Sequence, residues 1–279
     1  MWIRRKLDPD KLKDLYFTQR LSTIQIAGLF GTSPQTIGRA LRDMGMSRRS
    51  TREDNLVSWD SRDYTEVSFT RRQETIIVGT LLGDGSLHIQ YSSVNPLFSV
   101  AHKQMDKEYT EWKYKELEST HLFKNLPYWS IKKLRGKEFS RLQIRSIQHP
   151  TLLKYYKILY DGKQKRVTSE VLSYLDPLGL AVYYMDDGGL RNKEIPRLYT
   201  YGFLEEDLNL FKSFLEVTLG LRFVMRPVKY GPKRNRGFIM ELKLESLPRF
   251  RELIVPYILP IQCMSRKIPP SHQSLLVTP

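Results

Sequence analysis

The chain contains a single cysteine, Cys263, among its 279 residues. One thiol excludes an intramolecular disulfide and a zinc site built from Cys-x-x-Cys pairs, which favours a reducing compartment. Long apolar runs are also missing, because none approaches the roughly 18 residues needed to cross a bilayer. The N-terminal segment MWIRRKLDPDK lacks the apolar core of a signal peptide. We therefore expect no membrane partner and a cytoplasmic, nucleoid-associated location.

Acidic residues are too few to balance the basic ones. The chain has 45 Lys and Arg against 30 Asp and Glu, which gives a formal net charge of +15 and a pI of about 9.7. This excess favours a polyanionic partner, nucleic acid first, although a basic but otherwise ordinary enzyme could carry the same charge. The length allows about two domains, and the hydrophobic fraction of 41% is typical of a globular protein.

The histidines do not follow a metal-binding pattern. They include no H-x-x-x-H pair and no dense His-Asn-His spacing of the kind found in zinc-supported hydrolases. The sequence therefore argues against histidine-metal chemistry at any of the five positions, which are His88, His102, His121, His149 and His272.

The first 50 residues are predicted to form a separate helix-turn-helix domain. A first helix has one apolar side, an S-x-x-Q capping box opens a second helix at Ser22, and Ser33 with Pro34 opens a third. Close packing of the last two helices would use Ala27 and the turn residue Gly31. This pattern resembles the helix-turn-helix of site-specific recombinases and small regulators. The residues expected in its core are Leu12, Leu15, Tyr16, Ile37 and Leu41.

The third helix is expected to contact DNA, helped by a short basic extension. A plain helical hairpin is the alternative, and the positive charge of the chain favours DNA contact. The predicted contact residues are Gln35, Thr36, Arg39, Arg42, Arg48 and Arg49. Residues 51–69 are rich in Ser, Arg, Asp and Glu and have little apolar periodicity, so we expect a linker there.

Two apolar helices, each ended by an acidic residue and glycine, are the most informative motifs. They are IVGTLLGDG, residues 77–85, and LAVYYMDDG, residues 180–188. Thr70 and Gln73 offer a capping box before the first, and Asp176 with Pro177 opens the second. Small residues at Gly79 and Ala181 would let the two helices approach closely. The glycines that end them, Gly85 and Gly188, are expected to adopt the left-handed conformation.

The placement of the two carboxylates suggests a metal site. A helix C-terminus carries partial negative charge and unpaired carbonyl groups, so a carboxylate added there attracts a hard divalent cation. If the helices pack as a pair, Asp84 and Asp187 meet at one end of their interface. The predicted ligands are therefore Asp84, Asp187 and the carbonyl groups of Gly83 and Asp186.

These motifs resemble the paired signature of the LAGLIDADG homing endonucleases. Blocks outside the signatures are also similar to family blocks, so that the resemblance runs from Thr70 to Pro269. They are HKQMDKEYTEWKYKEL, GKQKRV, YLDPLGLA and PYILPIQCMSRKIP. The resemblance implies an α+β fold, a pseudo-twofold saddle of two αββαββα halves that straddles DNA. We place the halves at residues 70–173 and 174–279.

The resemblance also implies an activity and its catalytic residues. A monomer would cut both strands of a long, nearly asymmetric DNA target by hydrolysis with Mg²⁺ or Mn²⁺, leaving short 3′ overhangs. Asp84 and Asp187 would each serve one strand. Lys165 and Lys267 match positions of active-site lysines in the family, although Lys163 and Arg166 compete with Lys165.

Three alternatives remain open. A family member can act as a maturase that binds intron RNA, or as a DNA-binding transcription regulator that has lost catalysis. Retention of both aspartates argues against the regulator and leaves the maturase open. An intein is disfavoured because Met1 is not a Cys or Ser nucleophile and the C-terminal SLLVTP lacks a His-Asn pair. We therefore expect a free-standing protein.

Alternating strands are predicted where the saddle would need them. The runs SLHIQY, SRLQIR and FIMELKL place Leu87 with Ile89, Leu142 with Ile144, and Phe238 with Met240, Leu242 and Leu244 on inner faces. Polar side chains on the outer faces and a basic hairpin loop are expected to contact DNA. The predicted contact residues are Ser86, His88, Gln90, Arg141, Gln143, Arg145, Lys229, Lys233, Arg234 and Arg236.

Overall fold

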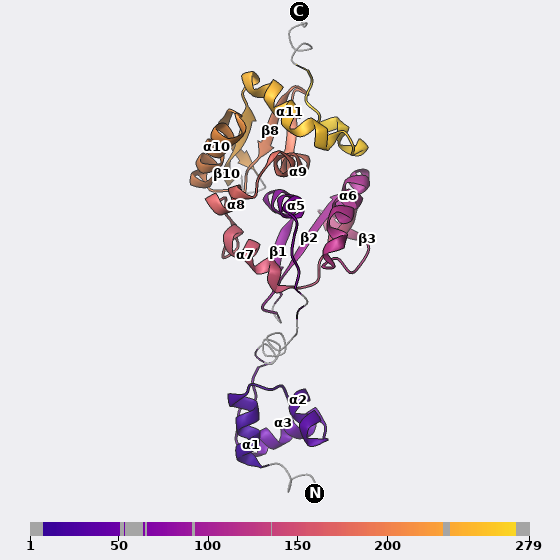
Figure 1. Cartoon of the computed structure of the whole chain (residues 1–279), viewed down its shortest axis with the longest axis vertical. Coiled ribbons are helices and arrows are strands. Elements are labelled where there is room, and N and C mark those ends of the chain that lie inside the picture. Colours follow the sequence, from indigo (N-terminus) through magenta and orange to yellow (C-terminus); the bar gives the residue numbers. More distant parts are fainter. Residues whose placement is uncertain are drawn as a thin grey trace, which may run out of the picture. The chain divides into compact units, whose positions relative to one another are not determined.

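The computed structural model describes residues 8–50, 53, 64, 66–90, 93–134, 136–230 and 235–271. The chain divides into two compact units, one bounded by residues 1–65 and 89–95 and the other by 66–88 and 96–279 (Figure 1). The predicted linker at 51–69 lies mostly outside the described residues. None of the helices that the structure describes is both long and apolar enough to cross a membrane.

The N-terminal unit consists of short helices around a small core of its own. Helix α1 (Pro9–Lys13) continues as a π-helical segment, η2 (Asp14–Thr18), and is followed by α2 (Thr23–Phe30) and α3 (Pro34–Asp43). Ser22 and Gln25 form the predicted capping box, and Gly31 ends α2 in the left-handed conformation at φ 58°. The predicted core is confirmed, with buried Leu12, Leu15, Tyr16, Ile26, Ala27, Ile37 and Leu41.

The second unit repeats one order of elements. Each half runs helix, strand, strand, helix, strand, strand, helix, which confirms the predicted αββαββα duplication. The first half contains α5 (Arg71–Leu82), β1 (Ser86–Ile89), β2 (Pro96–Lys103), α6 (Lys107–Leu117), β3 (Tyr128–Leu134), β4 (Lys137–Arg145) and α7 (Leu153–Leu159). The second contains α9 (Pro177–Asp187), β7 (Gly188–Arg191), β8 (Ile195–Tyr199), α10 (Glu205–Leu219), β9 (Phe223–Tyr230), β10 (Asn235–Leu242) and α11 (Leu247–Ile258).

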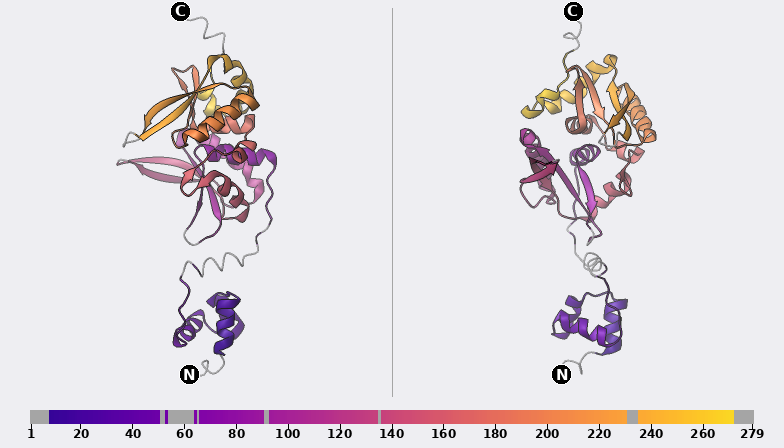
Figure 2. Two further views of the ribbon diagram at one scale, coloured as in Figure 1. Left: turned by 90° about the vertical axis from the view of Figure 1, so that its left-hand side faces the viewer. Right: turned by 180° about the vertical axis from the view of Figure 1, so that it is seen from behind.

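The two halves build matching four-stranded sheets. The strand orders are β1-β2-β4-β3 and β7-β8-β10-β9, and β2–β4, β3–β4, β7–β8, β8–β10 and β9–β10 pair antiparallel. The β3–β4 and β9–β10 hairpins project toward the same side of the unit, as the left view of Figure 2 shows. Between the halves, a small two-stranded sheet, β5 (Tyr160–Asp161) with β6 (Gln164–Lys165), precedes α8 (Ser169–Ser173).

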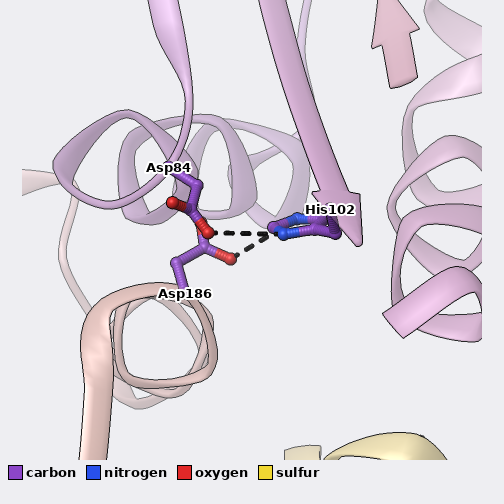
Figure 3. Close-up of side chains that lie close together, drawn as sticks. All are labelled: Asp84, His102 and Asp186. Atoms are coloured by element: carbon purple, nitrogen blue, oxygen red, sulfur yellow. Dashed lines mark ion pairs between the residues drawn. The ribbon is translucent and has the colours of Figure 1, made fainter. Parts of the chain in front are cut away.

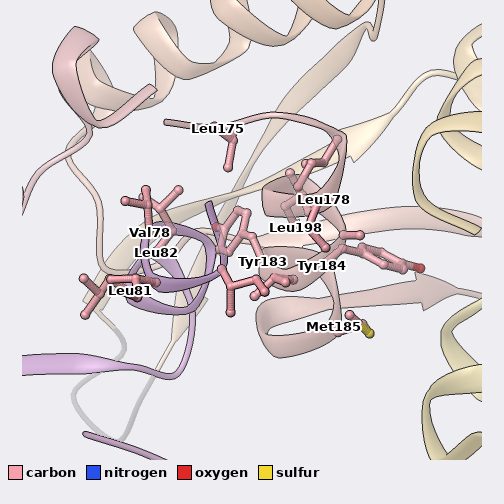
Figure 4. Packing of buried hydrophobic residues seen from close by; sticks show 14 of the residues in the cluster. Val78, Leu81, Leu82, Leu175, Leu178, Tyr183, Tyr184, Met185 and Leu198 are labelled. Atoms are coloured by element: carbon pink, nitrogen blue, oxygen red, sulfur yellow. The ribbon is translucent and has the colours of Figure 1, made fainter. Parts of the chain in front are cut away.

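Helices α5 and α9, which we call the signature helices, pack against each other at the centre of this unit (Figure 4). Both are apolar around most of their circumference, so both must be buried. A Cβ atom built on Gly79 would lie 2.6 Å from the carbonyl oxygen of Gly179. The close approach therefore pairs Gly79 with Gly179, and the role predicted for Ala181 stays a prediction. Ala181 is buried in the same core.

The glycines after the signature helices serve a different purpose from the one predicted. Gly188 has an extended backbone with φ −107°, and Gly85 is not among the residues with positive φ. A Cβ on Gly188 would lie 2.4 Å from the carbonyl oxygen of Tyr184, and one on Gly85 would lie 2.8 Å from that of Thr80. Glycine is thus required at both positions for space against the preceding turn, and the predicted left-handed conformation is wrong.

The predicted inner strand faces are confirmed for most residues, but Phe238, within β10, is only half-buried. Leu87, Leu142, Ile144, Met240 and Leu242 are buried as expected. Two residues predicted for inner faces are exposed, Ile89 because β1 ends at that residue and Leu244 because it lies in the 3₁₀ turn after β10.

Candidate active site

The C-termini of the signature helices bring three carboxylates close together. Asp187 is the last residue of α9, and Asp84 follows the end of α5 by two residues. A Cβ atom built on Gly83 would lie 2.4 Å from the Cβ of Asp186, so the two helix ends are in contact. The pKa of Asp187 is raised to about 7 by burial and by the charges of Asp84 and Asp186. Negative charge is therefore concentrated here.

Lys165 binds the end of the first signature helix. It comes from β6, and its ammonium group donates to the carbonyl oxygens of Leu81 at 2.6 Å, Gly83 at 3.0 Å and Gly85 at 2.7 Å. An ammonium has three N–H donors and a neutral amine has two, so three acceptors indicate the charged form. Burial lowers the pKa of Lys165, and the nearby aspartates oppose that shift. The positive charge complements the negative end of the helix dipole.

Lys267 binds the end of the second signature helix in the same way. It lies at the end of the 3₁₀ segment η7 (Gln262–Lys267) and donates to the carbonyl oxygens of Tyr184 at 3.4 Å, of Met185, and of Asp186 at 3.1 Å. Burial lowers its pKa, and the charge of Asp186 raises it. Both predicted lysines thus lie at the signature-helix ends, one in each half.

The two lysines also bear on the predicted metal ligands. The carbonyl groups of Gly83 and Asp186, which we predicted to bind a cation, each accept a hydrogen bond from an ammonium group. A second positive charge at these oxygens would be repelled. The arrangement therefore favours the carboxylates of Asp84 and Asp187 over the two carbonyl groups as ligands for a divalent cation.

A histidine contacts the first of the two catalytic candidates. His102 lies near the end of β2, with Nδ1 3.3 Å from Oδ2 of Asp84 and Nε2 3.7 Å from Oδ1 of Asp186 (Figure 3). Its side chain is buried, whereas 44% of the Asp84 side chain is exposed. Burial would raise the pKa of Asp84, but the hydrogen bond and charge of His102 and the charges of Lys113 and Lys267 lower it.

A buried ion pair lies behind this histidine and joins the two halves. Lys113 of α6 donates to both carboxylate oxygens of Asp186, at 2.7 and 2.9 Å, and its Nζ lies 3.3 Å from Nε2 of His102. The side chains of Lys113 and Asp186 are both 0% exposed. The potential ligand atoms of Asp84, His102 and Asp186 lie within 4.8 Å of one another, which would suit a metal ion. The ammonium of Lys113 already occupies both carboxylate oxygens of Asp186, so we do not assign a metal to this set of three residues.

Neither His102 nor Lys113 was among the predicted site residues. We predicted that no histidine takes part in metal binding. We did not predict that His102 would contact Asp84, a candidate metal ligand. A signal for Lys113 was present, because Tyr109, Lys113 and Leu117 are spaced by four and form the buried stripe of α6. A lysine within such a stripe must find a buried partner.

The polar face of the first sheet carries most of the residues predicted there. Residues Ser99 and Arg145, and likewise Ala101 and Gln143, lie opposite each other in the β2–β4 pairing. These side chains point away from buried Leu142 and Ile144. On this face His88 is exposed and Ser86, Arg141, Gln143 and Arg145 are half-buried, while Gln90 is exposed just after β1.

The polar face of the second sheet holds an arginine cluster that we did not predict. Glu241 of β10 is only 4% exposed. Its carboxylate forms ion pairs with Arg191 of β7 at 3.4 Å, Arg197 of β8 at 2.7 Å and Arg226 of β9 at 3.2 Å. One carboxylate thus organises an arginine from each of the other three strands. Sequence reasoning missed the cluster because its members are brought together only by strand pairing.

The predicted basic hairpin of the second half is only partly described. Lys229 is exposed and pairs with Arg236 in the β9–β10 register, which places it on the sheet face opposite to Arg226. Lys233 and Arg234 lie outside the described residues, as does the side chain of Arg236. Their contact with DNA stays a prediction.

In the N-terminal unit, Gln35, Arg39 and Arg42 are exposed on α3. The other predicted contact residues are partly used within the unit. Thr36 exchanges a hydrogen bond with Ser33 at 2.9 Å, and a Cβ atom built on Gly38 would lie 3.2 Å from the Arg48 guanidinium. The guanidinium of Arg49 stacks on the ring of Tyr16 at 3.9 Å and donates to the carbonyl of Leu21. Arg49 therefore stabilises the unit itself, and its guanidinium is less available for the predicted DNA contact.

The chain is similar to proteins of known class. Protein RecA of Mycobacterium gastri is 27% identical over 75% of this chain and 50% of its own length. The DNA endonuclease I-ChuI of Chlamydomonas applanata is 26% identical over 72% of this chain and 96% of its own length. The chain thus spans about half the length of the RecA proteins that it matches.

A solved structure has the same fold. The homing endonuclease I-WcaI bound to its DNA recognition sequence matches with a TM-score of 0.63 and 20% identity, covering 81% of this chain and 96% of that one. A family model described as the LAGLIDADG DNA endonuclease family matches residues 74–250. Because that match spans more than half of the chain and includes both signature helices with Asp84 and Asp187, this chain belongs to the LAGLIDADG DNA endonuclease family.

Proposed function

We propose that the chain cuts both strands of a DNA target by divalent-metal-dependent hydrolysis of phosphodiester bonds, with Asp84 serving one strand and Asp187 the other. The observation that carries this proposal is the duplication of one arrangement. An aspartate lies at or just after the end of each signature helix, and each helix end is bound by a half-buried lysine from its own half, Lys165 or Lys267. Two carboxylate–lysine centres side by side suit one cut in each strand.

The carboxylates present fit a divalent cation such as Mg²⁺ or Mn²⁺. The pKa of Asp187 is raised first by burial and then by repulsion from Asp84 and Asp186, and a cation would reduce that repulsion. We assign Asp84 and Asp187 as the ligands. A bound cation would polarise the phosphodiester and lower the pKa of a water molecule.

The side chains of the chain itself would then hold the substrate and stabilise its charge. Lys165 and Lys267 place fixed positive charges beside the carboxylates, although each has its three donors directed at backbone carbonyls. The polar faces of both sheets would contact a long, nearly asymmetric DNA duplex. With both halves in one chain, a monomer would be sufficient, and we expect short 3′ overhangs.

The N-terminal unit is proposed to add a second DNA contact through α3. Support comes from its independent core and from the exposed Gln35, Arg39 and Arg42 on one helix that begins at a capped N-terminus. The family match begins at residue 74 and does not cover this unit. Removal of residues 1–50 would show whether it extends the target site.

The test is cleavage of a randomised DNA pool with Mg²⁺ by the wild type and by Asp84→Asn and Asp187→Asn. We expect the wild type to make double-strand breaks at a defined sequence and each variant to nick one strand only. Asparagine keeps the shape of the side chain and removes its charge, so folding should be preserved. Circular dichroism of each variant checks this.

The alternatives give different results in the same experiment. If all three proteins bind DNA equally and none cuts, catalysis is refuted and a regulator becomes the better interpretation. Binding to structured intron RNA in preference to the duplex would instead support a maturase.

A further inference from the structure

We propose that His102 is a positioning residue for Asp84, fixed in turn by Lys113 and Asp186, and that it makes the two strand cuts unequal. The inference deepens the proposed function and rests on it. Loss of His102 should slow the cut assigned to Asp84 and spare the cut assigned to Asp187. The two halves would then have equivalent aspartates and lysines. They would differ in the side chains that position each aspartate.

The hydrogen-bond network assigns the tautomer of His102. The ammonium of Lys113 can only donate, and its Nζ lies 3.3 Å from Nε2, so Nε2 must be the acceptor. The ring proton is then on Nδ1, which lies 3.3 Å from Oδ2 of Asp84. His102 can therefore donate to Asp84 through Nδ1, and the hydrogen bond from Lys113 to Nε2 fixes this arrangement.

Room for this network comes from a difference between the two signatures. The second signature has Asp186 before the catalytic candidate, and the first has Gly83 at the same place. Any side chain at position 83 would collide with Asp186, since even a Cβ would lie 2.4 Å from the Cβ of that residue. Glycine in the first half thus lets the buried carboxylate of the second half reach Lys113.

The second half has no counterpart of this network at the matching positions. His102 lies five residues before the start of α6, and Thr200 lies five residues before the start of α10. Lys113 and Phe211 are both the seventh residue of their helices. Thr200 donates to the carbonyl of Phe238, and Phe211 packs against Tyr183, so neither can polarise an aspartate. The asymmetry is therefore built into the core.

The first measurement is the rate of each strand cut on a doubly end-labelled target. Asp84→Asn and Asp187→Asn assign one strand to each aspartate. For His102→Leu we expect the Asp84 strand to be cut about 10–100-fold more slowly, the usual effect of losing a hydrogen-bond partner behind a metal ligand. The Asp187 strand should change by less than about threefold, and it serves as the internal control for folding and DNA binding.

A second variant separates positioning from packing. In His102→Asn the amide NH₂ replaces the Nδ1–H donor, so this variant should recover part of the lost rate on the Asp84 strand. Equal slowing of both strands by His102→Leu, or no difference between the leucine and asparagine variants, would overturn the proposal.

The third measurement does not depend on cleavage. Nitrogen-15 NMR of the metal-free protein distinguishes the two histidine tautomers, and His102→Asn identifies the signal. We expect Nδ1–H in the wild type and loss of that preference in Lys113→Met. Nε2–H in the wild type would overturn the network. If the wild type shows Nδ1–H but cuts neither strand, the proposed function fails, the strand inequality fails with it, and the network is upheld.

Discussion

The buried pair of Lys113 and Asp186 allows the stability cost of one substitution to be worked out. Lys113→Met keeps the length of the side chain and removes its charge, leaving a fully buried carboxylate without its two hydrogen bonds at 2.7 and 2.9 Å. Breaking one partner of such a pair costs about 3–5 kcal/mol. For a unit of this size that corresponds to a fall in melting temperature of roughly 6–20 °C.

The same reasoning predicts that a second substitution rescues the first. Lys113→Met combined with Asp186→Asn removes both charges, so the double variant should recover more than half of the loss, because neutral replacement of a buried pair is often tolerated. Urea unfolding followed by tryptophan fluorescence measures all variants. Lys107→Met on the same helix is the matched control, since the pair of Lys107 with Glu111 is half-exposed at 3.5 Å and should contribute little.

Two results would contradict an unpaired buried charge as the cause of the loss. One is a Lys113→Met variant as stable as Lys107→Met, which would mean that water reaches Asp186. The other is a double variant no more stable than the single one, because the loss would then come from packing around the methionine and not from an unpaired charge. A double-mutant cycle separates these cases from the expected coupling.

Two further predictions concern charge at the site and on the second sheet. The pKa of Asp187 is about 7 in the folded chain against an ordinary 3.8, so its ionisation should destabilise the fold as pH rises from about 4 to 7. Without divalent cations, the stability gained by Asp187→Asn should therefore grow across that range in thermal unfolding, and Mg²⁺ should reduce the gain; a gain independent of pH would contradict this. Glu241→Gln should free the arginines that it holds and lower the affinity ratio for target over scrambled DNA by about tenfold, with tighter non-specific binding. Competition binding measures the ratio, and an unchanged ratio would show that the cluster does not read sequence.

Local signals in the sequence were sufficient for most of the fold. The capping boxes at Ser22 and Thr70 and the N-cap at Asp176 each satisfy backbone donors within three residues, so the sequence near each cap determines it. Alternation within β4 and β10 likewise placed buried leucines correctly. These features depend on residues that are close together in the chain, so a single sequence is enough to predict them.

Features that depend on contacts between distant segments were harder to predict. The partner of Gly79 is Gly179 because of the exact offset between two helices, and nothing local to either residue sets that offset. Similarly, Arg191, Arg197 and Arg226 meet at Glu241 only after four strands have paired. The partner of Lys113 was hidden for the same reason, since Asp186 comes from the other half.

The position of Asp186 shows why duplication of a motif need not give duplicate chemistry. The signature helices pack so closely that their ends share one volume, and only one of the two residues at positions 83 and 186 can have a side chain there. A carboxylate in that volume is buried and must be paired, so it draws a lysine from one half only. The histidine beside that lysine then lies 3.3 Å from Asp84, the catalytic candidate of the first half. A single crowded contact between two helices is thus sufficient to distinguish the two halves, and the rates of the two strand cuts would report that difference directly.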